Sequence, residues 1–168
     1  MHLAGAIGLL AVAGVVTTSA VAGGEREVRT HLTGYQEVPA VSTDASGKFA
    51  AKLRHSANEI RYELSYANLT GTVQQAHIHL GQRAVNGGIS VFLCSNLGNG
   101  PAGTQACPPA PAKISGTIRP AQVVGPEAQG LAPMEFGELV RAIRAGVTYV
   151  NVHSSTFPGG EVRGQLND

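Results

Sequence analysis

The clearest predicted strand in this chain is Glu59-Ile-Arg-Tyr-Glu-Leu-Ser-Tyr66, in which apolar and polar side chains alternate over eight residues. Successive side chains of a β-strand point to opposite faces, so this alternation predicts a strand with one buried and one solvent-facing side. The same alternation runs from Gly47 to Arg54, and His55-Ser-Ala-Asn58 between the two segments has the composition of a turn. Together the two segments predict an antiparallel hairpin.

Six further segments carry strand-like patterns and extend this hairpin into a larger β structure. They lie at residues 28–35, 73–80, 89–93, 113–118, 147–153 and 161–166. One segment breaks the pattern: residues 134–145 place apolar side chains at helical spacing, after Pro133 as a helix-start signal and before Gly146 as a helix-end signal. About eight short strands with one short helix predict an all-β fold, a Greek-key sandwich or barrel.

Length and composition limit the class of protein. The 168 residues suffice for one domain, and 43% apolar residues with a net charge of only +1 argue against intrinsic disorder. Lys and Arg number 12 against 11 Asp and Glu, whereas a nucleic-acid-binding protein needs a surplus of positive charge. The 22 glycines, 9 prolines and 14% charged residues suit a β domain rich in turns.

The first 22 residues contain no Lys, Arg, Asp or Glu, and residues 6–16 form an apolar run. Ala20-Val-Ala22 supplies the small residues of a signal-peptide cleavage site. We interpret residues 1–22 as a signal peptide and residues 23–168 as an exported domain, secreted, periplasmic or extracellular, with no membrane span of its own. Only His2 can supply positive charge before the apolar run, which is weak for a signal peptide. The alternative interpretation of these residues is an uncleaved N-terminal anchor.

Two cysteines, Cys94 and Cys107, flank a loop that contains three glycines and one proline. In an oxidising compartment such a pair is expected to be joined, and neither thiol has an adjacent basic residue that would activate it as a nucleophile. We therefore predict a disulfide, which contributes about 3 kcal/mol for a loop of this size in the chain-entropy model.

The residues best suited to chemistry are in His77-Ile-His79. Residues two apart on a strand point to the same face with Cα atoms about 6.5–7 Å apart, so both imidazoles can reach one metal ion. His153 shares one face of another predicted strand with Tyr149, and it would supply a third nitrogen if the two strands are neighbours. Three imidazoles on rigid strands suit copper or zinc. The alternative is that the histidines are structural and donate hydrogen bonds to carbonyl groups.

Other polar residues are candidates for orienting or tuning such a site. Glu37 follows the first predicted strand, and Glu161 and Arg163 lie on one face of the last. With Tyr149, these residues are expected to surround the metal ligands, where a carboxylate can orient a histidine ring. For the last strand, a salt bridge or a hydrogen-bonded ladder is the plainer interpretation. No residue is predicted to be catalytic, because the chain contains no nucleophile elbow, phosphate-binding loop or zinc-protease motif.

Four separated motifs, in this order, resemble the signature of the CHRD domain family. They are Leu32-Thr-Gly-Tyr-Gln-Glu-Val-Pro39, Ala76-His-Ile-His79, Tyr149-Val-Asn-Val-His153 and Pro158-Gly-Gly-Glu-Val-Arg-Gly-Gln-Leu166. The resemblance covers about residues 28–166 and implies a secreted, immunoglobulin-like β fold without an established activity. It places the family's histidine pair on His77 and His79 and its late histidine on His153. The family's closing acidic and basic residues fall on Glu161 and Arg163.

A fainter similarity, in the histidine pair and the late histidine, connects the chain to copper-zinc superoxide dismutase, which shares the sandwich architecture. The bridging histidine and the zinc-ligand cluster of that enzyme have no counterpart here. The sequence therefore predicts an exported β domain that binds copper or zinc through His77, His79 and His153. The main alternative is a metal-free adhesion module that engages an extracellular protein or a polysaccharide. A copper redox enzyme is the second alternative, although no nucleophile and base pair favours an enzyme.

Overall fold

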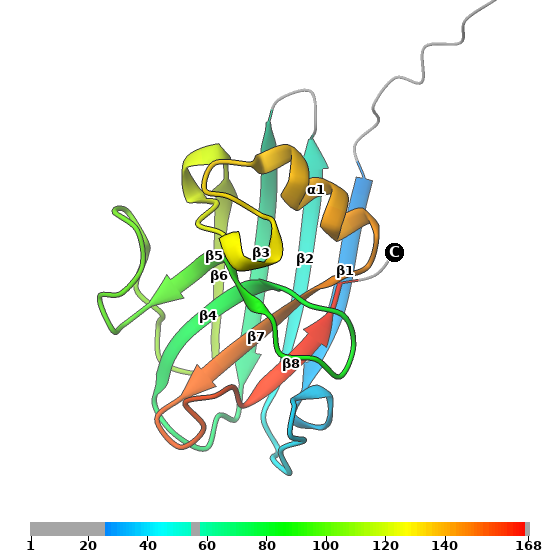
Figure 1. Cartoon of the computed structure of the whole chain (residues 1–168). Coiled ribbons are helices and arrows are strands. Elements are labelled where there is room, and N and C mark those ends of the chain that lie inside the picture. Colours follow the sequence, from blue (N-terminus) through cyan, green and yellow to red (C-terminus); the bar gives the residue numbers. More distant parts are fainter. Residues whose placement is uncertain (1–25, 55–57, 167–168) are drawn as a thin grey trace, which may run out of the picture.

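The computed structural model describes residues 26–54 and 58–166, which form eight β-strands, one α-helix and short 3-10 helices (Figure 1). The strands are β1 (Arg26–Thr33), β2 (Ser46–Arg54), β3 (Glu59–Ala67), β4 (Val73–Leu80), β5 (Gly88–Ser95), β6 (Ala112–Ile118), β7 (Thr148–Ser154) and β8 (Val162–Gln165). The helices are α1 (Phe136–Arg144), η1 (Gly34–Gln36), η3 (Pro120–Gln122) and η4 (Glu127–Gln129). The predicted signal peptide, residues 1–22, lies outside the described residues, as does most of the turn predicted at residues 55–58.

The strands form one antiparallel sheet in the order β5-β4-β7-β8-β1-β2-β3-β6, which curls until its edge strands β5 and β6 nearly meet. Tyr62 on β3 donates a hydrogen bond to the Leu93 carbonyl on β5 (2.9 Å). Gln105 Nε2 connects the two edges, because it donates to the Leu93 carbonyl (3.1 Å) and to the Ser115 carbonyl on β6 (3.2 Å). The predicted all-β fold of about eight strands and one short helix is therefore confirmed, as a nearly closed barrel or sandwich.

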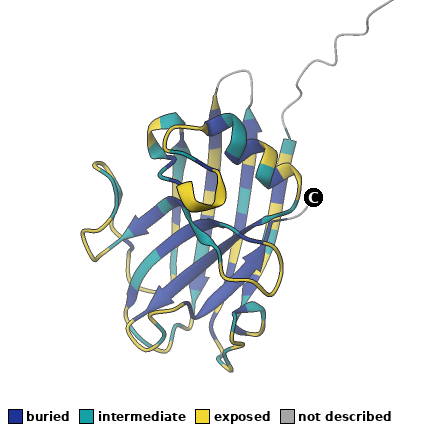
Figure 2. Ribbon diagram, viewed as in Figure 1, coloured by how far each residue is buried: buried dark blue, intermediate teal, exposed yellow. Residues whose placement is uncertain are grey.

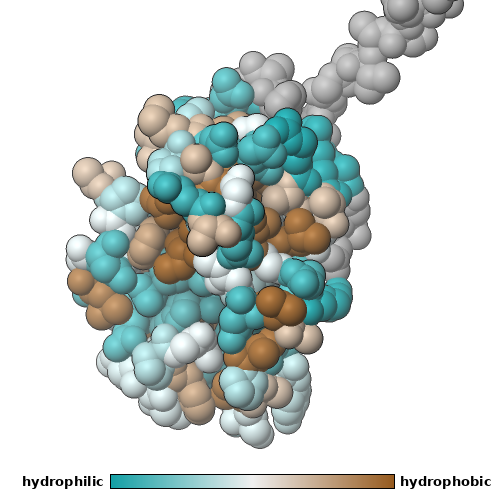
Figure 3. Space-filling view, in the orientation of Figure 1, coloured by the Kyte–Doolittle hydropathy of each residue, from teal (hydrophilic) through white to brown (hydrophobic). Residues whose placement is uncertain are grey.

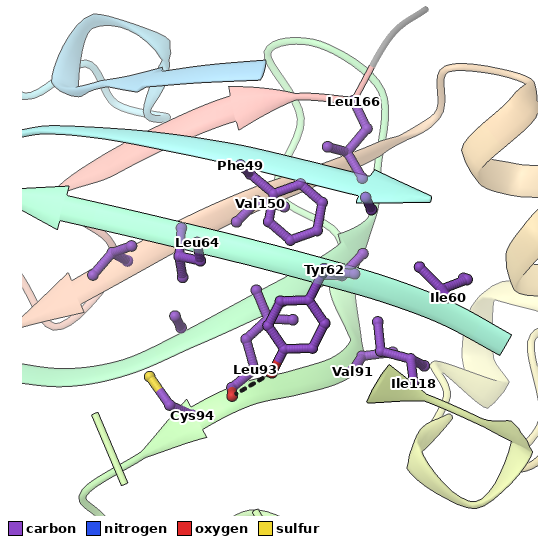
Figure 4. Close-up of a cluster of buried hydrophobic side chains, with 14 of the residues drawn as sticks. Phe49, Ile60, Tyr62, Leu64, Val91, Leu93, Cys94, Ile118, Val150 and Leu166 are labelled. Atoms are coloured by element: carbon purple, nitrogen blue, oxygen red, sulfur yellow. Dashed lines mark hydrogen bonds between the residues drawn. The ribbon is translucent and has the colours of Figure 1, made fainter. Parts of the chain in front are cut away.

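The hairpin predicted from residues 47–66 forms the centre of the core. β2 pairs with β3 along its whole length, and Phe49 lies opposite Leu64 in the register. The Phe49 ring stacks on that of Tyr62, with centroids 6.0 Å apart, and Ile60 and Leu64 are fully buried (Figure 4). The apolar positions of the alternating pattern are therefore the positions that face the core.

One polar residue of this hairpin departs from the alternation. Glu59 is only 6% exposed, although its position in the pattern predicts a solvent-facing side chain. The side chains of three arginines, Arg54, Arg61 and Arg119, form ion pairs with its carboxylate. These arginines remain substantially exposed and cover the carboxylate, so the charge of Glu59 is buried by its partners rather than by the core.

Helix α1 begins at Phe136, two residues after the predicted start at 134. Met134 stays outside the helix because its backbone has a φ of 68° and its N–H donates to the Val123 carbonyl. The buried stripe of α1 that joins the core consists of Phe136, Leu139, Val140 and Ile143. Gly146, with a φ of 69°, follows the helix as predicted. Over residues 26–54 and 58–166, no helix is long and apolar enough to cross a membrane.

Cys94 and Cys107 form the predicted disulfide, which joins the end of β5 to a loop that projects beyond that strand (Figure 1). The Asn96 amide nitrogen donates to the carbonyls of Val73 (3.1 Å) and Cys107 (2.9 Å), and its oxygen accepts from the Cys107 N–H (2.9 Å). One side-chain amide therefore fixes both ends of the loop that the disulfide closes.

Strands β7 and β8 are buried on both faces, unlike β2 and β3 (Figure 2). Their inner side faces the core. Their outer side is covered by residues 81–87, which we call the covering segment, and by η1, where the Gln36 side chain accepts a hydrogen bond from the Gln165 N–H (3.3 Å). Polar side chains occupy this covered outer face, and the histidines predicted to bind metal are among them.

Candidate metal centre on the outer face of β4 and β7

The three histidines lie on two neighbouring strands. β4 pairs with β7, so that His77 is opposite Asn151 and His79 is opposite Tyr149. One ring nitrogen from each of His77, His79 and His153 lies within 4.8 Å of those of the other two, and we call these residues the histidine cluster. The strand adjacency that the metal prediction requires is therefore present.

The histidine cluster is buried, and the covering segment contacts it at His79 through the Gly87 carbonyl. His77 is fully buried, and His79 and His153 are 7% and 6% exposed. Phe92 on β5 packs edge-on against the His77 ring, with centroids 4.5 Å apart. Because little water reaches the rings, any ring nitrogen without a partner is costly and any partner that the site accepts is bound more strongly.

Backbone carbonyls set the tautomer of two of the rings. His79 Nδ1 lies 2.9 Å from the Gly87 carbonyl, and His153 Nδ1 lies 2.9 Å from the Pro158 carbonyl. A carbonyl oxygen only accepts hydrogen bonds, so each Nδ1 must carry the proton. In the neutral ring the lone pair is then on Nε2, which is the arrangement that commonly orients metal-binding histidines.

These lone pairs have too few donors around them. His77 Nδ1 lies 3.2 Å from His153 Nε2, while the Nε2 atoms of His77 and His79 are buried and have no hydrogen-bond partner among the described residues. A buried acceptor without a donor costs about 1–3 kcal/mol. The neutral His77 ring has one lone pair, on Nε2 if Nδ1 donates to His153 Nε2 and on Nδ1 otherwise. With either tautomer at least two lone pairs of the cluster have no donor, and a cation would satisfy them.

Burial also sets the charge of the rings. It lowers the pKa of His77 to about 2 and that of His79 to about 4, and it lowers the pKa of His153 as well. Repulsion from the neighbouring histidines adds to the effect on His77, whereas the hydrogen bonds to Gly87 and Pro158 oppose it at the other two rings. All three rings are neutral near neutral pH, which is the form of imidazole that binds metals.

Tyr149 connects the cluster to a buried arginine. Its ring stacks on that of His79, with centroids 4.6 Å apart and an interplanar angle of 2°. The Arg163 guanidinium lies over the Tyr149 ring, 3.4 Å from its centroid. Arg163 also donates hydrogen bonds to three acceptors of the covering segment: the Gln82 carbonyl (3.1 Å), the Val85 carbonyl (2.9 Å) and Asn86 Oδ1 (3.3 Å). This arginine therefore holds in place the covering segment, which contacts His79 and Tyr149 through Gly87.

Glu37 is buried next to Asn151 and is 6% exposed. Burial raises its pKa to about 7, although the nearby charge of Arg163 and hydrogen bonding by Asn151 act in the opposite direction. A Cβ on Gly160 would lie 2.4 Å from Glu37 Oε1 and 2.9 Å from Asn151 Nδ2, so both atoms occupy the space that a side chain would need. Gly160 also has a φ of 128°, which favours glycine at this position.

Glu161, the other candidate carboxylate, has a different environment. It accepts hydrogen bonds from Thr43 Oγ1 (2.9 Å) and from the Thr70 N–H (2.8 Å), and so ties two loops to the start of β8. Burial disfavours its ionisation, but hydrogen bonds from Ser154, Thr70 and Thr43 outweigh burial and hold its pKa below the usual value. Glu37, Tyr149 and Arg163 adjoin the histidine cluster or its neighbours, whereas Glu161 anchors loops.

Two features of the site were not among its predicted residues, although the sequence places Asn151 on the same strand face as His153. Asn151 is 2% exposed and points its Oδ1 at His153 Nε2, 3.0 Å away. Its spacing of two residues from His153 was the available signal, because that spacing puts both side chains on one face of a strand. The covering segment had no such signal, because residues 81–87 show neither strand nor helix periodicity.

Comparison with known proteins agrees with this architecture. The model of the CHRD domain matches residues 28–166, and the chain therefore belongs to the CHRD domain family, a β domain of extracellular type. No curated protein and no solved structure matches the chain. The similarity to copper-zinc superoxide dismutase consequently rests on the histidine pattern and the sandwich architecture alone.

Proposed function

We propose that this domain binds one copper or zinc ion through His77, His79 and His153. The observation that carries the proposal is the convergence of buried imidazole nitrogens that have lone pairs and lack donors. Neutral imidazoles held by backbone carbonyls are ligands that both metals accept. Three protein nitrogens also leave room for a further ligand, since such ions are usually at least four-coordinate.

The spacing of the nitrogens supports a shared ion. Metal–nitrogen bonds are about 2.0–2.1 Å long, so two ligands of one tetrahedral ion lie about 3.3 Å apart. His77 Nδ1 and His153 Nε2 are 3.2 Å apart. When one ring nitrogen is taken from each of the three histidines, no two of them are more than 4.8 Å apart. Small rotations of the rings would bring the third nitrogen to bonding distance.

A metal-free role leaves this arrangement largely unexplained. If His77 Nδ1 donates to His153 Nε2, that one contact is satisfied, but the lone pairs on Nε2 of His77 and His79 still have no donor. An ion held by His77 Nδ1, His79 Nε2 and His153 Nε2 would occupy all three lone pairs and leave only the His77 Nε2–H without a partner. Among the described residues only four large hydrophobic side chains are exposed: Tyr35, Val85, Leu97 and Met134. On the face shown in Figure 3, hydrophobic and hydrophilic side chains are interspersed, whereas a docking surface for a protein is typically a contiguous apolar patch.

We also propose that the domain is exported after removal of residues 1–22. The apolar run and the small residues at 20–22 support export, as do the disulfide between Cys94 and Cys107 and membership of a family of extracellular type. Mass spectrometry of the protein recovered from its native compartment would detect the new N-terminus. Recovery of the intact chain would contradict cleavage.

Elemental analysis tests the metal proposal. The protein, purified without chelator or affinity metal and reconstituted with Cu²⁺ or Zn²⁺, is expected to hold about one equivalent of metal. His77→Ala and His153→Ala should lose it, while the matched variant His31→Ala should keep it, because His31 is exposed on β1. At a free-metal concentration of about 100 times Kd, binding should raise the free energy of unfolding by about 2.7 kcal/mol.

Two results would overturn the proposal. Absence of bound metal in the reconstituted wild type would make the histidines structural residues. Equal uptake by wild type and by folded His77→Ala would place the metal elsewhere in the chain. Circular dichroism of each apo variant distinguishes loss of a ligand from loss of the fold.

A further inference from the structure

The Asn151 side chain directs an acceptor atom at an acceptor nitrogen of the histidine cluster. Its Oδ1 is 3.0 Å from His153 Nε2. His153 Nδ1 carries the proton that goes to the Pro158 carbonyl, so Nε2 of the neutral ring has only a lone pair. An amide oxygen also has only lone pairs. Two buried acceptors at this distance repel each other unless a positive charge lies between or beside them.

Glu37 explains why the amide has this orientation. Asn151 Nδ2 and Glu37 Oε1 both lie near the position that a Cβ on Gly160 would take. Glu37 Oε1 has no hydrogen bond of normal geometry among the described residues, and the neighbouring Asn151 amide favours the charged form of Glu37. A carboxylate accepts hydrogen bonds, so it attracts the NH₂ end of the amide. The oxygen at the other end is then directed at the histidine cluster. The positive charge of Arg163 also favours the charged form of Glu37.

We infer that Asn151 Oδ1 is the fourth donor of the metal site and that Glu37 is the residue that positions it. The resulting set of three nitrogens and one oxygen selects divalent copper or zinc over monovalent copper. This inference rests on the proposed metal-binding function. An amide oxygen is a hard donor that suits divalent ions, whereas monovalent copper prefers soft sulfur ligands.

The distances agree with ligation by a common ion. The contacts of His153 Nε2 with Asn151 Oδ1 (3.0 Å) and with His77 Nδ1 (3.2 Å) are close to the separation of about 3.3 Å expected between ligands of one tetrahedral ion. His153 Nε2 thus has two neighbours at the spacing of fellow ligands. Asn151 is also opposite His77 in the β4–β7 register, so rigid strands hold both residues.

Metal affinities of paired variants test the inference. Competition with chelators gives the affinities for Cu²⁺, Zn²⁺ and Cu⁺ in the wild type, Asn151→Ala and Asn151→Asp. Asn151→Ala is expected to lose about tenfold or more in affinity for Cu²⁺ and Zn²⁺ while its affinity for Cu⁺ stays within about threefold. A tenfold loss of affinity for Cu²⁺ with no change in affinity for Cu⁺ raises the reduction potential of the bound copper by about 59 mV. Asn151→Asp keeps an oxygen donor and should bind Cu²⁺ at least as tightly as the wild type.

The role of Glu37 is tested by a second pair. Glu37→Ala frees the amide of Asn151 and should weaken Cu²⁺ binding in the same selective way, by less than Asn151→Ala does. Glu37→Gln retains an oxygen that accepts from Asn151 Nδ2 and should restore most of the affinity. The electron paramagnetic resonance spectrum of bound Cu²⁺ should change in Glu37→Ala and return towards that of the wild type in Glu37→Gln.

Each contrary result has a distinct meaning. If Asn151→Ala binds all three ions as the wild type does, or loses Cu⁺ and Cu²⁺ equally, the inference is wrong. The amide is then reversed, with Nδ2 donating to His153 Nε2, or it only supports the fold. The metal proposal itself survives if His77→Ala still loses the ion. If Asn151→Ala does not fold, weaker Cu²⁺ binding by folded Asn151→Asp than by wild type overturns the inference. A wild type that binds no metal overturns both.

Discussion

Two parts of the outer surface of this barrel carry polar residues in the same alternating pattern, but these residues differ in their exposure to solvent. On β3 and β6, Glu63 and Lys113 form an ion pair whose side chains are 58% and 62% exposed. On β8, Arg163 is 1% exposed and is held by a tyrosine ring and three acceptors of the covering segment. The first face is solvated, whereas the second is a polar interior.

The difference arises from what lies over each face. Water satisfies the exposed side chains, so their individual partners matter little. The covering segment and η1 exclude water from β4, β7 and β8, so every polar atom there needs a partner from the protein or from a ligand. Arg163 has its partners, whereas the Nε2 atoms of His77 and His79 have none among the described residues. A cluster of buried polar groups that is only partly satisfied costs stability, and its retention is best explained by a ligand.

The largest expected difference between the faces comes from their arginines. Arg163→Ala removes the guanidinium from Tyr149 and from the covering segment, and it leaves Glu37 buried without nearby positive charge. Because Arg163 is 1% exposed and donates three hydrogen bonds, its loss leaves acceptors of the covering segment unpaired, and we expect urea denaturation of the apo protein to show a loss of about 3–5 kcal/mol. Arg29→Ala on β1, where the side chain is 73% exposed, should change the free energy of unfolding by less than about 0.5 kcal/mol. Similar losses in the two variants would contradict the comparison.

Acid should destabilise the apo protein through the covered face. The unfolded chain protonates its histidines near pH 6.5, whereas folded His77 and His79 remain neutral down to about pH 4 or below. Below about pH 6.5 the unfolded state therefore binds more protons, and stability falls with pH. Glu37 acts in the opposite direction between its unfolded pKa of 4.5 and its folded pKa of about 7, because there the folded state binds the extra proton. Denaturation in the presence of a chelator should show a net loss of about 1–2 kcal/mol between about pH 7 and 5.5.

Two variants sharpen this test. Glu37→Gln removes the opposing contribution, so its stability should fall more steeply with acid than that of the wild type. His31→Ala on the solvated part of β1 should leave the slope unchanged. An apo protein that gains stability from about pH 7 to 5.5 would show that the buried rings are protonated in the folded state.

The smallest effect is expected on the solvated face. Lys113→Ala breaks the ion pair with Glu63, which solvent screens, and should lower the free energy of unfolding by less than about 1 kcal/mol. The effect should shrink further in high salt. A loss of several kcal/mol that persists in salt would mean that this face is as dependent on specific partners as the covered one.

Local patterns predicted most of the secondary structure. The alternation at 59–66 corresponds to a buried row on β3, and the helical spacing at 134–145 corresponds to α1, shortened at its start by the backbone conformation of Met134. Within the correctly predicted strand β3, Glu59 is the residue whose burial the pattern did not predict. Its burial depends on Arg119, which is distant in sequence, and no local pattern contains that information.

The candidate site is predictable only in part for the same reason. The pair His77 and His79 follows from strand periodicity, because residues two apart share a face. That His153 joins them depends on β4 lying beside β7, with β5 and β6 intervening in the chain. The direction of the Asn151 amide depends on Glu37, which comes from yet another segment near η1.

By itself, the sequence determined the all-β class, the strand positions, the pair of cysteines that forms the disulfide and the family to which the chain belongs, because these depend on short-range periodicity and on residue identity. Tertiary structure alone decided which polar face is buried, which nitrogens converge and which of them lack donors. Those properties depend on the order of strands in the sheet and on the path of the covering segment, where contacts join residues far apart in the chain. Burial is therefore what distinguishes the histidine cluster from the equally polar side chains on β2 and β3.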